Sequence, residues 1–287
     1  MLKGDVFLID LHIHTIFSDG TNTPEEIILL AKEKGLKAIA ISDHDTLNGL
    51  EQAKDFGKIN NIEVINGIEF SAEFNGKEIH ILGYFLDDKN ENLLKELKKF
   101  EKTRDERNIQ LIKKFKELNL DIDLDYVKSL AGNNILTKLH FAKAIFEKGY
   151  TSSIKEAFSL YLAENKPAYI KRELINYEDA IKLILNAGGI CSLAHPYVYK
   201  YSEKELEENI KILKEKGLQC IECYYSGHTR KQTNTLLKYC EKFDLETTAG
   251  SDFHGENKFY VSFGEIFLGE KVDYKILETL KNKFNYS

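Results

Sequence analysis

The sequence lacks a long apolar run. No stretch approaches the roughly 20 consecutive apolar residues that a helix needs to span a bilayer. Met1 to Asp5 lead directly into the strand-like run Val6 to Ile9, without the basic, apolar and small-residue segments of a signal peptide. We therefore expect a cytoplasmic protein that has no membrane partner.

An excess of positive charge is also absent. The 40 Lys and Arg residues are outnumbered by 46 Asp and Glu residues, which gives a net charge of 40 − 46 = −6. A negative protein has no global field that attracts polyanions, so we do not expect long nucleic acid as a partner. A small anionic substrate would have to be bound by metal ions and by local Arg or Lys side chains.

Cysteine is scarce as well, with four residues at positions 191, 220, 223 and 240. Cys220 and Cys223 have the spacing of a zinc knuckle, but no second pair completes such a site. They also lie in a strand-like run, where a separation of three places side chains on opposite faces. The sequence therefore favours buried free thiols over a thiolate zinc site.

The pattern of apolar residues divides the chain. Residues 1–90 and 171–287 alternate strand-like and helix-like runs, whereas residues 91–170 show only helical spacing. The first predicted helix, 25–34, has Thr23 as its N-cap, Pro24 at its first position and Gly35 after its end. Repeated βα units predict a parallel barrel or a doubly wound sheet. We expect 1–90 and 171–287 to form this α/β domain, with 91–170 inserted as a helical cap.

Two local patterns refine this prediction. Asn75-Gly76 is a strong hairpin signal, and it predicts that a strand over 62–70 turns into a strand that carries His80. The apolar residues from Phe263 to Phe267 predict a last strand before a C-terminal helix.

Histidines and carboxylates recur at the ends of short apolar runs in this sequence. Six of the eight histidines end or closely follow a short apolar run, and Glu69 and Asp252 occupy the same kind of position. Side chains at the carboxyl ends of barrel strands meet at one face, so these residues are expected to converge. His12 and His14 are two residues apart and can bind one ion from the same strand face. Since imidazole and carboxylate together bind divalent Zn, Mn or Fe, the sequence predicts a metalloenzyme.

These motifs resemble the polymerase and histidinol phosphatase (PHP) family over the whole chain. In the family's order they are DLHIH at 10–14, SDG at 18–20, SDHDT at 42–46, GIE at 67–69, His80, AHP at 194–196 and GSDFH at 250–254. The length and the helical insertion are similar to those of the stand-alone phosphoesterases, a branch that includes nucleoside 3′,5′-bisphosphate phosphatases, some of which trim short RNA from the 5′ end. The resemblance implies a distorted (β/α)7 TIM-like barrel with an inserted helical cap.

The resemblance also implies ligands for two or three divalent ions, which would be Mn, Fe or Zn. The first ion would be held by His12, His14, Glu69 and Asp252. Glu69 would bridge to a second ion, also held by His80 and His195. A third would be held by His44 and His254, with Asp19 beside them where some family members have a histidine. Asp43 and Asp45, on either side of His44, are expected to support the ligands rather than to bind metal.

Cations of the cap are candidates for binding an anionic substrate. Arg104 and Arg107 share a helix face, and Arg172 precedes the return to the barrel. The phosphatase branch usually has Arg-Pro-His where this chain has Lys138-Leu139-His140, which weakens a bidentate phosphate contact there. The alternative for each of these cations is a solvated helix face.

His228 follows the predicted strand 219–225 and resembles a histidine that the phosphatase branch has after this strand. We expect it to contact phosphate or to donate a proton to the leaving group. An ordinary surface histidine is the alternative.

The implied activity is hydrolysis of a phosphate ester by a metal-activated water. The first hypothesis is a metal-dependent phosphoesterase acting on a nucleotide, of the 3′,5′-bisphosphate type, or on a short oligonucleotide. The second is a phosphatase of a non-nucleotide metabolite such as histidinol phosphate, although histidinol phosphatases of the family generally lack a cap between these motifs. The third is a non-catalytic metal-binding module like the polymerase-associated versions of the domain.

Overall fold

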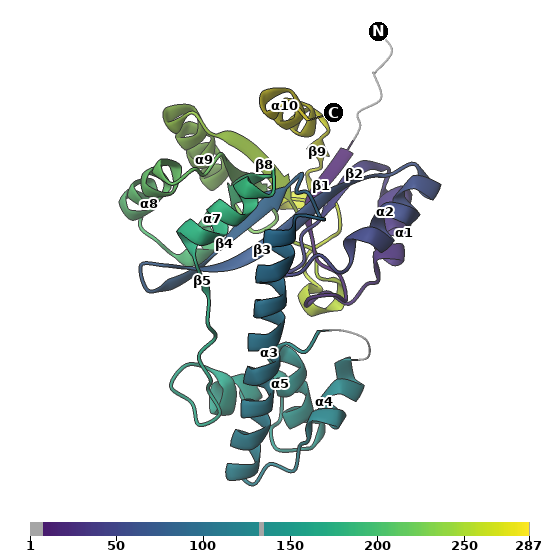
Figure 1. The fold of residues 1–287 in the computed structure, drawn as a ribbon, viewed down its shortest axis with the longest axis vertical. Coiled ribbons are helices and arrows are strands. Elements are labelled where there is room, and N and C mark those ends of the chain that lie inside the picture. The colour runs from purple at the N-terminus through teal and green to yellow at the C-terminus, as the bar shows by residue number, and fades with distance from the viewer. Residues whose placement is uncertain (1–7, 132–134, 287) are drawn as a thin grey trace. The chain divides into compact units, whose positions relative to one another are not determined.

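The computed structural model describes residues 8–131 and 135–286 (Figure 1). The chain forms two compact units, Met1–Leu94 with Leu174–Ser287, and Lys95–Glu173. We call the first the barrel unit and the second the helical unit, and each is described by itself. None of the described helices is both long enough and apolar enough to cross a membrane.

The barrel unit is built on one mixed sheet with the strand order β8-β7-β6-β4-β3-β2-β1-β9, and β5 pairs with β3. Its strands are β1 Leu8–Ile13, β2 Leu36–Ile41, β3 Glu63–Phe74, β4 Lys77–Tyr84, β5 Ile175–Asn176, β6 Ile190–Leu193, β7 Cys220–Tyr225, β8 Glu246–Gly250 and β9 Val272–Asp273. The end of β1 also meets the segment after β8, since the His14 N–H donates to Phe253 O and the Asp252 N–H to His12 O, each over 2.9 Å. These bonds nearly close a barrel, which confirms the predicted fold class.

The helices of the barrel unit connect these strands. They are α1 Pro24–Lys34, α2 Leu50–Asn60, α7 Tyr177–Asn186, α8 Glu203–Glu215, α9 Arg230–Phe243 and α10 Lys275–Phe284. The start of α1 is as predicted: Thr23 and Glu26 form a reciprocal capping box, and Pro24 is the first helical residue. Gly35 ends the helix at φ 74°, a conformation that glycine adopts without steric strain.

The predicted hairpin is confirmed, and it gives β4 its direction. Asn75 and Gly76 have φ values of 51° and 77°, as a two-residue type I′ turn requires. β4 therefore pairs antiparallel with β3 and also with β6. As a result His80 lies in the middle of β4, opposite Ser71, whereas the other histidines among the candidate ligands lie near or after strand ends.

The predicted strand over Phe263–Phe267 is wrong. The segment has no strand pairing, Phe267–Gly269 forms a 3-10 turn, and the last strand is β9, antiparallel to β1. The Gly264 N–H donates to Asp10 Oδ2 over 3.0 Å, and Gly264 has a φ of 72°. Phe263 and Ile266 are buried, so the apolar pattern that suggested a strand reflects core packing of an irregular segment.

The helical unit has a hydrophobic core of its own. Its elements are α3 Glu91–Glu117, which begins in the barrel unit, α4 Leu124–Ala131, α5 Lys138–Glu147, α6 Ile154–Ala157 and a π-helical turn Phe158–Leu162. Phe115 and Phe141 lie at its centre with ring centroids 6.0 Å apart, and both are fully buried. Helical structure in this part of the chain agrees with the predicted spacing, and none of its described residues belongs to a group that can hold a metal.

Candidate metal centre

All nine predicted metal ligands lie together in the barrel unit. His12 is in β1, and Glu69 and His80 are in β3 and β4; the other six follow β1, β2, β6 or β8. Their ligand atoms form four overlapping groups, each within 4.8 Å: His14, Asp19, His44 and His254; His12, Glu69 and His195; His12, His14 and Asp252; His44, Glu69 and His80. The convergence expected from strand ends therefore occurs.

Glu69 occupies the middle of this arrangement. Its Oε1 lies 2.9 Å from His80 Nδ1, 3.0 Å from His195 Nε2 and 3.4 Å from His12 Nε2. Its Oε2 lies 3.2 Å from both His14 Nε2 and His44 Nδ1. Each carboxylate oxygen thus faces a different set of histidines, which is the geometry expected of a carboxylate that bridges two ions.

The donor set fits divalent metal ions. Two donors bound to one ion at about 2.1 Å lie roughly 3.0–3.4 Å apart in octahedral or tetrahedral geometry. His14 Nε2 lies 3.4 Å from Asp252 Oδ1, and His254 Nε2 lies 3.2 Å from Asp19 Oδ1. Buried atoms without a hydrogen-bond partner include His12 Nε2, His14 Nε2, Asp19 Oδ1 and Glu69 Oε2. Unpartnered polar atoms are rare in protein interiors, so their clustering indicates a place for cations.

Glu222 is a functional residue that sequence reasoning missed. It is fully buried in β7, its Oε1 lies 2.8 Å from His12 Nδ1, and its Oε2 accepts the backbone N–H of His195 over 2.7 Å. A carboxylate on Nδ1 holds the proton there and leaves Nε2 free to bind metal. One side chain therefore orients ligands from two of the groups. A carboxylate within the otherwise apolar start of β7 is the signal that could have revealed it.

Asp43 and Asp45 support the centre from beside His44. Asp43 accepts hydrogen bonds from the Thr15 N–H (2.7 Å), the Thr15 hydroxyl (2.6 Å) and the Ser18 hydroxyl (2.5 Å). Asp45 accepts one from the Ser71 N–H over 3.2 Å. Neither aspartate belongs to a group of potential metal ligands. Asp43 thereby fixes the loop that leads from His14 to Asp19.

Asp252 is held by two residues that the sequence did not indicate. Lys258 Nζ lies 2.6 Å from Asp252 Oδ2, and the Tyr225 hydroxyl donates to the same oxygen over 3.0 Å. These contacts leave Oδ1 directed at His12 and His14. The backbone of Asp252 has a φ of 59° and that of His195 a φ of 28°, both in the left-handed region. Such strain clusters at functional sites because the surrounding structure must enforce it.

The electrostatics of the centre favour ionised carboxylates. Burial opposes the charge of Glu69, but His80, His44 and His12 outweigh burial and hold the pKa of this carboxyl well below its usual range. Burial likewise opposes the charge of Asp252, whereas His12 and Lys258 lower its pKa well below the usual range. The carboxylates are therefore charged at neutral pH, as cation binding requires.

His228 lies in the barrel unit, close to the ring of Tyr225, which is also close to the candidate ligand His195. The ring of Tyr225 is 5.0 Å from His228 and 5.4 Å from His195, measured between centroids. His228 Nδ1 donates to Cys223 O over 3.1 Å, and its Nε2 is buried without a partner. Burial lowers the pKa of His228 to about 4. It is thus a neutral imidazole whose Nε2 carries a lone pair.

The other predicted substrate-binding residues belong to the helical unit. Arg107 is half-buried, its Nε has no hydrogen-bond partner, and burial together with Arg172 and Arg104 lowers its pKa to about 10. Lys138 Nζ lies 4.8 Å above the Tyr169 ring. His140 caps its own helix, because its Nδ1 accepts the Thr137 N–H over 3.1 Å. The three arginines form a like-charged cluster, which we call the arginine cluster.

Comparison with known proteins agrees with this geometry. The sequence model of the PHP domain matches residues 10–226, which include seven of the nine candidate ligands. The chain belongs to the PHP family.

Several relatives of this PHP-family protein are named as phosphoester hydrolases. The chain is 32% identical over 264 residues to a 5′-3′ exoribonuclease of Haemophilus influenzae, covering 92% of this chain and 94% of the relative. It is 29% identical over 247 residues to a 3′,5′-nucleoside bisphosphate phosphatase of Chromobacterium violaceum, covering 86% and 87%. A Bifidobacterium adolescentis structure assigned as a metal-dependent phosphoesterase matches with a TM-score of 0.82 at 26% identity over 96% of both chains. The protein is a metal-dependent hydrolase of phosphoester bonds.

Proposed function

We propose that this PHP-family phosphoesterase hydrolyses a phosphate ester of a nucleoside 3′,5′-bisphosphate or of a short oligonucleotide. The observation that carries the proposal is the arginine cluster of the helical unit. Arg107 is half-buried beside Arg104 and Arg172, and three like charges in one place create a positive potential that attracts anions. A substrate with a second phosphate supplies such an anion. Two relatives, a 5′-3′ exoribonuclease and a 3′,5′-nucleoside bisphosphate phosphatase, have names that agree with this substrate class.

Two or three ions of Mn, Fe or Zn would be held by Glu69 and the eight other candidate ligands around it. Bound there, the ions would offset the charge of the ester and of the leaving oxygen and would lower the pKa of a water. His12 and His195 are held in place for this role by Glu222. Lys258 and Tyr225 fix Asp252.

His228 would contact the substrate through its unpartnered Nε2. With its pKa near 4 the imidazole is neutral at pH 7, so it cannot donate a proton from Nε2 before substrate binds. A phosphate dianion next to Nε2 would raise this pKa, since an opposite charge stabilises the imidazolium. Proton donation to the leaving group would then be coupled to substrate binding.

A substrate panel tests the proposal. With manganese present, kcat/KM would be measured for adenosine 3′,5′-bisphosphate, a 5′-phosphorylated oligoribonucleotide, adenosine 5′-monophosphate and histidinol phosphate. We expect the first or second to be preferred over both monophosphates by at least about tenfold, the effect of one charge-assisted contact. Equal turnover of the bisphosphate and the monophosphates would rule out the nucleotide substrate and leave the phosphoesterase. Metal binding without turnover of any ester would favour the accessory module.

A further inference from the structure

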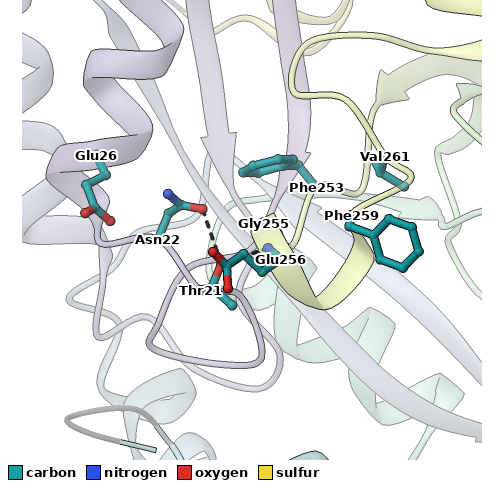
Figure 2. A pocket seen from close by; sticks show the side chains of 8 residues that line it. All are labelled: Thr21, Asn22, Glu26, Phe253, Gly255, Glu256, Phe259 and Val261. Atoms are coloured by element: carbon teal, nitrogen blue, oxygen red, sulfur yellow. Dashed lines mark hydrogen bonds between the residues drawn. The ribbon is translucent and has the colours of Figure 1, made fainter. Parts of the chain in front are cut away.

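A cavity of about 520 Å³ lies in the barrel unit between the segments that follow β1 and β8 (Figure 2). It has no part in the reaction described so far. The residues that line it are Thr21, Asn22, Glu26, Phe253, Gly255, Glu256, Phe259 and Val261.

The cavity adjoins the metal centre, because some of its lining residues are next to candidate metal ligands in the chain. Phe253 and Gly255 flank the candidate ligand His254 in the chain, and Thr21 follows Asp19 by two residues. The Thr21 N–H donates to His254 O over 3.2 Å, and the Glu256 N–H donates to the Thr21 hydroxyl over 3.0 Å. Consecutive Cα atoms are about 3.8 Å apart, so the cavity begins within one residue of the metal ligands.

A glycine makes this close approach possible. Gly255 has a φ of 64°, and a Cβ at this position would collide with the Thr21 hydroxyl and the Asn22 side-chain oxygen. The backbone of Gly255 is therefore packed directly against the side chains of Thr21 and Asn22.

The chemistry of the lining excludes a phosphate and suits a nucleobase. Glu26 and Glu256 are the charged residues of the lining, and they would repel an anion. Phe253 and Val261 supply apolar surface, and Phe253 is itself supported by Phe263 at 5.2 Å between ring centroids. Asn22 directs its oxygen toward the Thr21 hydroxyl and its amide nitrogen away from it (Figure 2). A planar, uncharged group with amino donors and ring acceptors matches this combination of apolar and polar groups.

Phe259, which lines the cavity, and Tyr260, which follows it in the chain, both have exposed aromatic rings. Phe259 is 86% exposed and Tyr260 is 73% exposed, with ring centroids 5.7 Å apart. The two rings are nearly perpendicular, at 84°, so a base that stacks on Phe259 can meet the ring of Tyr260 edge to face. They directly follow Lys258, whose Nζ is 2.6 Å from the candidate ligand Asp252. Lys258 thereby holds this aromatic segment next to the metal centre.

We propose that this cavity binds a base of the substrate, which stacks on Phe259, beside Tyr260, and forms hydrogen bonds with Asn22. The proposal rests on the nucleotide substrate of the proposed function. It adds a site for the base, which contacts with phosphate cannot recognise. The site would take the base of the reacting nucleotide or of its neighbour in a short RNA.

The test compares substrates with and without a base. kcat/KM would be measured for adenosine 3′,5′-bisphosphate and for ribose 3,5-bisphosphate, with the wild type, the double variant Phe259→Ala/Tyr260→Ala and the control Leu268→Ala. Leu268 is 80% exposed and outside the cavity lining, so all three substitutions should leave folding intact. Loss of base stacking should lower kcat/KM for the nucleoside bisphosphate about five- to a hundredfold, mainly through KM, and leave the ribose bisphosphate and the metal content unchanged.

The outcomes separate this proposal from the function on which it rests. If the wild type hydrolyses both bisphosphates equally well, or if the double variant keeps the full preference for the nucleoside, the base site is overturned and the phosphoesterase stands. If the wild type hydrolyses neither bisphosphate but does hydrolyse other monoesters, the nucleotide function fails and the base site fails with it. A second variant, Asn22→Ala, should change the preference between adenosine and uridine bisphosphates, because its amide is the base-reading group of the site.

Discussion

The metal centre and the arginine cluster differ in how firmly the structure holds their charged side chains. In the centre, side chains from six strands and their following segments surround one carboxylate, and each position is fixed by strand pairing and by buried partners such as Glu222. In the arginine cluster, long side chains from α3 and from the segment before β5 bring like charges together. A rigid sheet can set distances between ligands to a fraction of an ångström, whereas long cationic side chains adapt to what they bind. We therefore expect the reaction to depend on the barrel unit and the preference for a second phosphate to depend on the helical unit.

The largest expected effect is at Glu69. Glu69→Gln removes a charge that faces five histidines, so at least one ion should be lost together with activity, with kcat/KM falling by about a thousandfold or more. Metal content by elemental analysis and activity on a simple phosphate monoester provide the measurements. Glu33→Gln, an exposed change on α1, is the matched control. A full complement of metal in Glu69→Gln would contradict the bridging role.

A smaller effect should follow from loss of the carboxylate that orients two ligands. Glu222→Gln keeps the size of the side chain but no longer fixes the proton on His12 Nδ1. We expect metal affinity to fall about ten- to a hundredfold, with activity restored by excess metal. Titration with manganese, followed by calorimetry and by activity, checks this. Unchanged affinity would show that strand pairing alone positions His12. The barrel unit would then hold its ligands even more firmly, relative to the side chains of the helical unit, than we infer.

The helical unit should respond differently. Arg107→Ala should lower kcat/KM for a nucleoside bisphosphate by roughly ten- to a hundredfold, the equivalent of about 1.5–3 kcal/mol for a charge-assisted contact, while metal content stays normal. Lys113→Ala, an exposed change on the same helix, is the control. Normal kcat/KM in alanine variants at Arg107, Lys138 and Arg172 of the helical unit and at His228 of the barrel unit would contradict this prediction, because none of the four side chains would then recognise phosphate.

The smallest effect concerns the stability of the barrel unit at low pH. The pKa of His228 is about 4 in the folded protein against 6.5 for an ordinary histidine, so between these values the unfolded chain binds more protons than the folded protein. Stability should therefore fall as the pH falls through this window, by about 1 kcal/mol between pH 6 and pH 5 from this residue. His228→Asn retains a donor for Cys223 O and should reduce the slope by that amount in urea unfolding of metal-free protein. An unchanged slope would show that His228 is solvated.

The sequence predicts those site residues that a local pattern in the chain marks, and not those whose partners are set by the tertiary fold. His12, His44 and His195 follow apolar runs, and polar residues at strand ends are visible in the chain itself. Glu222 and Lys258 could not be assigned in this way, because their partners His12 and Asp252 are set by strand order and by the path of a loop. Asn75-Gly76 predicted a hairpin from local backbone preference, which placed His80 in the correct strand. The strand predicted over Phe263 to Phe267 was wrong because a buried irregular segment shows the same apolar pattern as a strand.

The joining of β1 to the segment after β8 has a consequence for how the protein is made. His12 and Asp252 are neighbours through a backbone hydrogen bond although 240 positions separate them in the chain. Contacts of such high sequence separation form late, since closing a long loop must precede any gain from it. A nascent chain that has not yet released the residues around Asp252 and His254 from the ribosome contains most of the metal-binding side chains without the two that complete their groups. Metal loading is therefore expected to be a post-translational step that follows closure of the barrel.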